Sequence, residues 1–453
     1  MLTNLMRRPS EAIALFSFAL AAVPAVVQHE EAREKARVTA TYTLPDVPLG
    51  GADNPSRPED ASADRGIRLG SIGSDLWRGA GDPDGEFWMI TDRGPNGLLK
   101  IDGETRRTFL APEFNPAILR VKLDGGAIRI LETVPLVTGS GKPVTGLPNV
   151  AGRDETPYDH SGREKLSFNP NGLDSEGLVQ TATGEFWVAE EYGPSLLKID
   201  RTGKVMKRYI PEGVKLEGAD YAVMPVLPAI YGKRKINRGF EGLALSDDQK
   251  ILYIALQSPL SNPDKKTGDA SRNTRILAFD IPSEKVVAEY FYRFDAAKDF
   301  DPAHSKPDEM KISGLLSIKP DTLLVLERTD WVAKLYLVDL AAATNILGGK
   351  WDDPATAPAL EALEEPVEDA KPLAKTLLAN LKEVDGVPEK IEGIAVIDAN
   401  TIAVSNDNDF DIGEPDRTGN NVGKGMKSHT LILRLGRPLP LPPPANGQPM
   451  SAH

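Results

Sequence analysis

Short apolar runs, each opened by the same small phrase, recur along the chain. The phrase is Glu-Gly followed by Leu or Ile, and its glutamates are Glu176, Glu241 and Glu392. After each copy an apolar run reaches a turn, and a second apolar run returns and ends on polar residues. Two apolar runs joined by a short turn are typical of a β-hairpin.

The hairpin that opens at Glu176 has a close counterpart earlier in the chain. Residues 186–194 read FWVAEEYGP, and residues 87–95 read FWMITDRGP. We assign the opening phrase of the earlier hairpin to Arg78-Gly79-Ala80, so an arginine stands where the other copies carry glutamate. A weaker copy opens at Ser313. Five similar hairpins in one chain form an internal repeat, which predicts a repeat architecture.

Each hairpin continues into further apolar segments. Third strands are expected at residues 117–123, 195–200, 275–280, 334–339 and 430–434, and fourth strands at residues 128–131 and 286–290. Four antiparallel strands per unit, repeated around an axis, define a β-propeller. The sequence therefore predicts an all-β fold, a β-propeller of five to six four-stranded blades that is closed by an N-terminal strand at residues 38–43.

The rest of the chain is expected to divide into four segments. Residues 1–25 resemble a signal peptide because two arginines precede an apolar stretch, and an uncleaved anchor or an amphipathic helix is the alternative. Residues 26–65 form an N-terminal extension with the closing strand, and residues 66–436 form the propeller. Residues 437–453 are a Pro-rich tail that we expect to be disordered. A localisation in the periplasm or outside the cell follows.

One insertion, residues 345–370, carries the acidic run Glu361-Ala362-Leu363-Glu364-Glu365. Such a run is more often a solvated face than a site, so we expect its glutamates to be exposed.

Trp88 and Trp187 stand at matching positions of two hairpins. Large aromatic residues in the middle of a strand are more often core than ligand contacts, and we expect both to be buried.

Composition limits the possible chemistry. The 453 residues carry a formal net charge of -13, which argues against a nucleic-acid partner and suits cation binding. The chain has no cysteine, which excludes disulfides, cysteine nucleophiles and thiolate metal sites. It has five histidines, and none forms a close pair in the sequence. No run after the first segment is long and apolar enough to span a bilayer.

Hairpin geometry places the candidate chemistry. In an antiparallel pair, the residue that opens the first strand lies beside the residues that close the second. The opening residues are Arg78, Glu176, Glu241, Ser313 and Glu392, and the closing residues include Asp92, Arg93, Glu190, Glu191, Gln257, Arg328, Asn406 and Asp407. If first strands line a common channel, these side chains converge at one mouth. Converging carboxylates need a positive partner, and oxygen ligands without histidine or cysteine favour Ca²⁺ over Mg²⁺.

The last hairpin ends in Asn406-Asp407-Asn408-Asp409-Phe410-Asp411, which matches only the start of a calcium loop of the EF-hand type. Ile412 stands where the glycine belongs, and Thr418 where the bidentate glutamate belongs. An irregular calcium site is the interpretation that remains. The alternative is a purely structural ring, in which the glutamates pair with Arg78, Arg93 and Arg328 and the glycines serve close packing.

These motifs together resemble the phytase-like domain family, described as having esterase-like activity of phytase. The resemblance rests on the Glu-Gly phrases, on TDRGPN at residues 91–96, on FWVAEEYGP at residues 186–194 and on NDNDF at residues 406–410, and covers roughly residues 66–435. It implies a secreted or periplasmic β-propeller related to calcium-dependent hydrolases of phosphate or carboxylic esters.

The resulting hypothesis is a calcium-dependent hydrolase of phosphoesters with a small-molecule substrate. Its metal ligands would be Glu176, Glu241, Glu392, Asn406 and Asp407, its catalytic residues Glu190, Glu191 and Asp92, and its substrate-binding residues Arg78, Arg93 and Arg328. A carboxylesterase or lactonase on the same scaffold is one alternative. A non-catalytic propeller that binds a cell-envelope partner is the other.

Overall fold

Each copy of the repeated phrase begins the first strand of an antiparallel hairpin. The structure, a computed structural model, describes residues 35–49, 65–414, 416 and 420–442, so the predicted signal peptide lies outside it, as does most of the Pro-rich tail. The hairpins are β2 (Asp75–Trp77) with β3 (Glu86–Ile90), β9 (Ser175–Gln180) with β10 (Phe186–Glu190), β14 (Phe240–Leu245) with β15 (Ile251–Leu256), β18 (Lys311–Lys319) with β19 (Thr322–Arg328), and β22 (Ile391–Asp398) with β23 (Thr401–Asn406).

Outer strands extend each hairpin into a larger sheet, as the sequence predicts. They are β6 (Ala117–Asp124), β7 (Ala127–Pro135), β11 (Ser195–Ile199), β12 (Val205–Pro211), β13 (Ala222–Leu227), β16 (Asn273–Asp280), β17 (Lys285–Arg293), β20 (Ala333–Asp339), β21 (Ala374–Asn380) and β24 (His429–Arg434). β13 joins β12 in parallel and gives that sheet a fifth strand. The other pairings that these outer strands make with the hairpins and with one another are antiparallel.

The N-terminal strand β1 (Arg37–Thr43) pairs antiparallel with β24 near the other end of the chain. It therefore supplies the fourth strand beside β22, β23 and β24, at the position expected for residues 38–43. Thr43 also pairs in parallel with Ala127 of β7, so this sheet continues into the first one. The strands β2, β3, β6 and β7 and the strands β1, β24, β23 and β22 thus form one continuous eight-stranded sheet.

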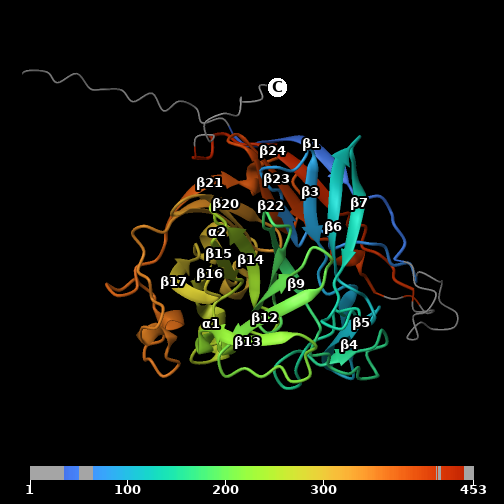
Figure 1. Ribbon diagram of the computed structural model, residues 1–453, viewed down its shortest axis with the longest axis horizontal. Coiled ribbons are helices and arrows are strands. Elements are labelled where there is room, and N and C mark those ends of the chain that lie inside the picture. Colours follow the sequence, from blue (N-terminus) through green and yellow to red (C-terminus); the bar gives the residue numbers. More distant parts are fainter. Residues whose placement is uncertain (1–34, 50–64, 415, 417–419, 443–453) are drawn as a thin grey trace, which may run out of the picture. The chain divides into compact units, whose positions relative to one another are not determined.

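The first strands lie next to one another and form the inner layer of the fold. Contacts run from β2 to β9, then to β14, β18 and β22, and return to β2. In Figure 1, β9, β14 and β22 lie inside, whereas β7, β13, β17 and β21 lie outside. All five residues of β10 are buried, because neighbouring sheets cover both of its faces. This is a nearly all-β fold of the propeller type.

The expected core tryptophans are confirmed, since Trp88 is 8% and Trp187 1% exposed.

The expectation of a solvated acidic run at residues 361–365 is wrong for Glu361. This side chain is fully buried, and its Oε1 accepts a hydrogen bond of 2.9 Å from Nη2 of Arg275. Arg275 is itself buried within β16, and a buried guanidinium requires a carboxylate partner.

A small sheet that the sequence analysis did not predict lies outside the repeats. It consists of β4 (Asn96–Ile101), β5 (Glu104–Phe109) and β8 (Pro157–Tyr158). The Asp102-Gly103 pair between β4 and β5 has positive φ at both residues, as two-residue hairpin turns require. That dipeptide is the signal that would have revealed the hairpin.

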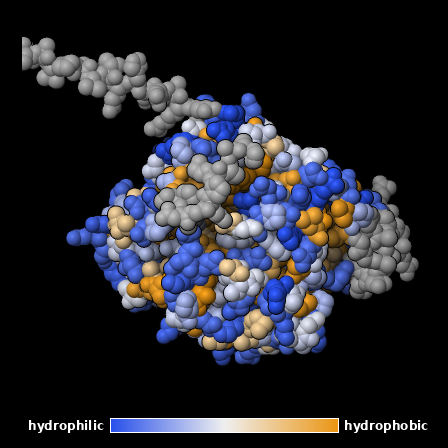
Figure 2. Space-filling model, turned by 45° about the horizontal axis from the view of Figure 1, so that its top comes forward, coloured by the Kyte–Doolittle hydropathy of each residue, from blue (hydrophilic) through white to orange (hydrophobic). Residues whose placement is uncertain are grey.

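Helices are few and short among the described residues. They are α1 (Lys265–Ala270), α2 (Ala297–Phe300) and the 3-10 turns η1 (Ala229–Lys233), η2 (Pro307–Glu309), η3 (Lys350–Asp352), η4 (Leu360–Ala362), η5 (Leu381–Glu383) and η6 (Asp409–Asp411). None of these has the length and apolar character needed to cross a membrane. Hydrophilic side chains dominate the face shown in Figure 2, with apolar residues in smaller patches between them.

Candidate functional site

The glycine of each repeated phrase allows neighbouring first strands to approach closely. A Cβ added to Gly177 would lie 2.5 Å from the carbonyl oxygen of Glu241, and one added to Gly314 would lie 2.8 Å from that of Glu392. Cβ atoms are not found this close to a backbone oxygen, so a larger residue would push the strands apart. The glycines thereby bring the adjacent glutamates together.

The carboxylates form two groups that share one member. Oxygens of Asp174, Glu176 and Glu191 lie within 4.8 Å of one another, and so do oxygens of Glu176, Glu241 and Glu392. We call these five residues the acidic cluster. They come from the starts of three first strands, from the residue before β9 and from the residue after β10. The sequence prediction that distant glutamates converge is therefore correct for Glu176, Glu241 and Glu392.

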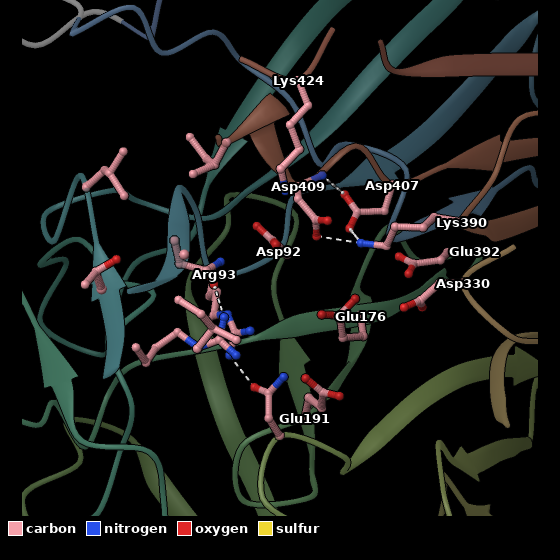
Figure 3. A pocket seen from close by; sticks show the side chains of 18 of the residues that line it. Asp92, Arg93, Glu176, Glu191, Asp330, Lys390, Glu392, Asp407, Asp409 and Lys424 are labelled. Carbon is pink, nitrogen blue, oxygen red and sulfur yellow. Dashed lines mark hydrogen bonds and ion pairs between the residues drawn. The ribbon is translucent and has the colours of Figure 1, made fainter. Parts of the chain in front are cut away.

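The acidic cluster lies at a cavity of about 540 Å³. Glu176, Glu191, Glu241 and Glu392 line it, and Figure 3 shows Glu176, Glu392 and Asp92 at this cavity. Basic side chains line it as well, namely Arg93, Arg107, Arg238, Lys311, Arg328, Lys390 and Lys424. A pocket with acidic and basic side chains on its walls can take both a cation and an anionic ligand.

Two arginines neutralise part of the acidic cluster. Nη1 of Arg93 lies 3.0 Å from Oδ2 of Asp174. Nη2 of Arg328 contacts Glu392 and lies 3.7 Å from Oε1 of Glu241. Among the described residues, these are the ion pairs that the five carboxylates make. Two positive charges for five acidic groups leave the cluster with an excess of negative charge whenever all five are ionised.

Glu176 is the least compensated member of the cluster. It is 9% exposed and forms no ion pair with a residue that the structure describes, and its side-chain hydrogen bond is shared with another acidic group, Asp174. By contrast, Nε2 of Gln257 donates to Oε1 of Glu191 at 2.7 Å and to Oε2 of Glu241 at 2.5 Å. Because a buried carboxylate is normally paired or hydrogen-bonded, Glu176 is the position at which an additional positive partner is most needed.

The pKa values of the cluster report this crowding. Burial raises the pKa of Glu176 well above its usual range, and the nearby charges of Glu241 and Asp174 raise it further. Burial also raises the pKa of Glu392 to about 8, although Arg328 opposes the shift. Strongly raised carboxyl pKa values in a cavity are typical of functional sites.

Comparison with known proteins identifies the family. A family model described as phytase-like, esterase-like activity of phytase, matches residues 74–410. The chain belongs to the phytase-like family. The resemblance predicted from the sequence motifs is thus confirmed.

One relative and two solved structures resemble this chain more distantly. An uncharacterized secreted protein of Arthroderma benhamiae is 28% identical over 294 residues, which cover 56% of this phytase-like chain and 57% of that relative's length. A putative glucose dehydrogenase from Thermus thermophilus shares 12% identity with a TM-score of 0.35, covering 88% of this chain and 99% of that one. A luciferin-regenerating enzyme shares 9% identity with a TM-score of 0.33, covering 80% and 92%.

Most residues predicted for the site of this phytase-like chain lie at the cavity. They are Asp92, Arg93, Glu176, Glu191, Glu241, Arg328, Glu392 and Asp407. Asp92 is 7% exposed, and its Oδ1 accepts a 2.7 Å hydrogen bond from the backbone N–H of Gly94. Burial, together with the charges of Asp407 and Asp174, raises the pKa of Asp92 well above its usual range. The predicted roles of these residues remain predictions.

Glu190 does not reach the cavity. Its side chain is fully buried, and its Oε2 accepts hydrogen bonds from Nη2 of Arg208 at 2.6 Å and from Oγ of Ser195 at 2.7 Å. Glu190, the last residue of β10, is held by Arg208, whereas Glu191, the next residue, lines the cavity. The expectation that the two glutamates share one mouth is therefore wrong.

Arg78 lies at a different cavity, together with Trp77, Asp82 and Gln180. Trp77 pairs with Trp88, as Val179 pairs with Trp187, so Arg78 corresponds to Gln180 at the turn end of the hairpin. The assignment of Arg78 to the position of Glu176 is therefore wrong by four residues.

Asn406 and Asp407 are engaged by the protein itself. Oδ1 of Asn406 accepts a 2.7 Å hydrogen bond from the backbone N–H of His429, and Asn406 does not line the cavity. Nζ of Lys390 lies 2.9 Å from Oδ2 of Asp407, as Figure 3 marks, and Oγ of Ser71 donates to Oδ1. In place of a calcium loop, this end of the cavity thus has a lysine that neutralises the aspartates.

Sequence analysis missed Asp174, Lys311, Lys390, Asp330 and Arg238. Three of these stand two residues before an opening residue: Asp174 before Glu176, Lys311 before Ser313, and Lys390 before Glu392. Residues two apart in an extended segment point to the same side. This spacing is the signal that would have found them.

The donor set of the acidic cluster suits a hard divalent cation. It offers several carboxylate oxygens and no nitrogen or sulfur, which is the chemistry that Ca²⁺ prefers. The unpaired Glu176 belongs to both carboxylate groups and would be the central ligand. The cluster therefore fits the calcium ion that the sequence predicts, whereas Asn406 and Asp407 do not contribute to it.

The raised pKa values predict how the stability of this phytase-like chain depends on pH. Buried carboxyls that hold their protons in the folded state have released them in the unfolded chain above about pH 4.3. The stability of the metal-free protein should therefore be highest near about pH 5 and fall as the pH rises toward about 8, where Glu392 ionises. Thermal unfolding in chelator across this range should show a midpoint several degrees lower at the upper end.

This experiment has an upper pH limit and a control variant. The measurement should stop near pH 8, because burial lowers the pKa of Lys311 to about 8 and its titration has the opposite effect above that value. Glu185→Gln, a half-buried position in the β9–β10 hairpin that is not part of the acidic cluster, should leave the pH dependence unchanged. A midpoint that rises steadily from about pH 5 to about 8 would contradict the raised carboxyl pKa values.

Proposed function

We propose that the chain is a calcium-dependent hydrolase of phosphoesters that acts on a small molecule outside the cytoplasm. The observation that carries the proposal is the unpaired Glu176 at the junction of two carboxylate groups, in a cavity whose walls also bear basic side chains. Membership of the phytase-like family supports a hydrolase. The name of the Arthroderma benhamiae relative, a secreted protein, supports a periplasmic or extracellular location.

We interpret the scaffold as a five-bladed propeller. Five first strands contact one another in a cycle, and β1 adds to the sheet of β22, β23 and β24. In such a scaffold the site lies where first strands begin, so one residue from each of several blades can reach it. Residues 66–436 would form the propeller, following a signal peptide and an N-terminal extension.

Glu176, Glu241 and Glu392, with Asp174 and Glu191, are the side chains that would hold calcium. Bound calcium supplies positive charge that polarises a phosphoryl oxygen and makes a water molecule more acidic. Arg93 and Arg328 keep Asp174 and Glu392 in position through their ion pairs.

Asp92 is the proposed general base. It lines the cavity but belongs to neither carboxylate group, and its raised pKa makes it a stronger proton acceptor than an ordinary carboxylate. Water would attack phosphorus while Asp92 takes its proton. The bond from phosphorus to the ester oxygen then breaks, the leaving oxygen takes a proton from solvent water, and Asp92 returns its proton to solvent.

The test is a comparison of an aryl phosphate, an aryl acetate and a lactone, each with chelator and with added calcium. We expect turnover of the phosphate to depend on calcium and to exceed that of the other two substrates. Faster turnover of the acetate or lactone would overturn the phosphoester assignment in favour of a carboxylesterase or lactonase. Calcium binding without any turnover would favour a non-catalytic binding propeller, and turnover unaffected by chelator would discard the mechanism.

A further inference from the structure

Most cavity cations are already engaged by carboxylates. Nζ of Lys311 lies 2.6 Å from Oδ1 of Asp330, and Nζ of Lys390 lies 2.9 Å from Oδ2 of Asp407. Arg93, Arg107 and Arg328 likewise form ion pairs with acidic side chains of the protein. These groups balance charge within the cavity wall, and binding an anion would require them to exchange one partner for another.

Arg238 differs from these five cations. It lines the cavity, it is half-buried, and no ion pair joins it to a carboxylate of the described chain. Its contact is a hydrogen bond of 3.1 Å from Nη1 to Oγ of Ser258. A guanidinium has five N–H donors, so most of its donors remain for a ligand. Lys424 also lacks an ion pair within the described chain, but it is solvent-exposed.

The backbone fixes Arg238 beside the acidic cluster. Lys235 and Arg238 form an antiparallel bridge around a turn in which Asn237 has a φ of 54°, a conformation that asparagine tolerates better than most residues. A Cβ added to Gly239 would lie 2.1 Å from the carbonyl oxygen of Glu191. The turn is therefore pressed against the backbone of Glu191, which carries one of the cluster carboxylates.

Ser258 holds the guanidinium in place. It is 1% exposed, and its Oγ lies 3.4 Å from the carbonyl oxygen of Met310, to which it donates a hydrogen bond. The charge of Arg238 affects groups on both sides of the cavity. It opposes the effect of burial, which raises the pKa of Glu191, and it adds to the effect of burial, which lowers the pKa of Lys311. Arg238 thus stands between the acidic cluster and the basic wall.

We infer that Arg238 is the residue that selects anionic esters, by binding the charged oxygens of a substrate whose reacting group faces the acidic cluster. This inference rests on the proposed function, because that function places the ester in this cavity. A half-buried, unpaired guanidinium donates two parallel hydrogen bonds to a phosphoryl or carboxylate group, which a neutral ester cannot accept with the same strength.

Calorimetry with phenylphosphonate, which cannot be hydrolysed, is the first test, and benzoate serves as the carboxylate probe. Arg238→Gln should weaken phenylphosphonate binding by about tenfold or more, and Arg238→Lys by less. Calcium affinity should not fall, because the substitution removes a positive charge near Glu191. Arg129→Gln is the matched control, because Arg129 is exposed on β7 and pairs with Asp124. Tighter binding of benzoate than of phenylphosphonate would assign the subsite to carboxylates.

Kinetics provide the second test. For an aryl phosphate, Arg238→Gln should raise KM by about tenfold or more, whereas the KM for a neutral aryl acetate should rise much less. Equal losses for both substrates would show a structural role and overturn the inference, as would unchanged phenylphosphonate binding. If the wild type binds phenylphosphonate through Arg238 but hydrolyses nothing, the proposed function fails while the anion subsite stands.

Discussion

Replacing Glu176 by glutamine should stabilise the metal-free protein and abolish its stabilisation by calcium. The substitution removes one of five crowded carboxylates, so repulsion within the acidic cluster decreases. It also removes the ligand shared by both carboxylate groups. We expect calcium affinity to fall by at least about 100-fold, since even outer partners of metal ligands contribute about 10- to 100-fold.

Thermal unfolding with and without calcium measures both effects. At a calcium concentration about 100 times its Kd, the wild type should gain about 2.7 kcal/mol, and Glu176→Gln close to none. Turnover of an aryl phosphate should fall with the affinity. Glu185→Gln changes the same residue type at a position of the same hairpin that is not part of the acidic cluster, and it should behave as the wild type. Lower stability of Glu176→Gln in chelator would show that the cluster is compensated without a cation.

Replacing Glu190 by alanine should destabilise the protein by about 3–5 kcal/mol, because it leaves the buried guanidinium of Arg208 without its carboxylate. The same carboxylate also accepts hydrogen bonds from Ser195 and from the backbone N–H of Tyr192. Denaturant unfolding measures the loss.

A conservative variant separates charge from hydrogen bonding. Glu190→Gln retains a hydrogen-bond acceptor and should lose less stability than Glu190→Ala. Calcium binding should be unchanged in both, because Glu190 does not line the cavity. Wild-type stability combined with lost turnover in Glu190→Ala would instead support the catalytic role that the sequence predicts for this residue.

The repeated phrase explains why much of the fold could be predicted. Its glycines mark the places where first strands nearly touch, as Gly177 does against Glu241, and a residue that must lack a side chain leaves a trace in the sequence. The alternation of apolar runs and turns places the strands within a few residues. The β4–β5 hairpin is not predicted because it lies outside the repeat, and its sequence signal is the dipeptide Asp102-Gly103.

The site could be predicted only in part, because the direction in which a side chain points depends on the register of its strand. Glu190 and Glu191 are neighbours in sequence, yet one is buried against Arg208 and the other lines the cavity. The likeness of Arg-Gly-Ala to Glu-Gly-Leu predicts Arg78 at the mouth of the channel, whereas strand pairing puts it at the opposite end of its hairpin. A shift of a few residues along a strand is invisible in composition and decides which end of the channel a side chain reaches.

The sequence by itself determined a repeated, almost entirely β architecture, its family, and the gathering of Glu176, Glu241 and Glu392, since periodicity and obligatory glycines are local properties of a chain. Only the tertiary structure decided which charges neutralise which. Lys390 neutralises the aspartates at one end of the cavity, and at the other end two arginines form the ion pairs of a cluster of five carboxylates. Arg238 makes no ion pair within the described chain. Such pairing depends on distances of a few ångström between segments far apart in sequence.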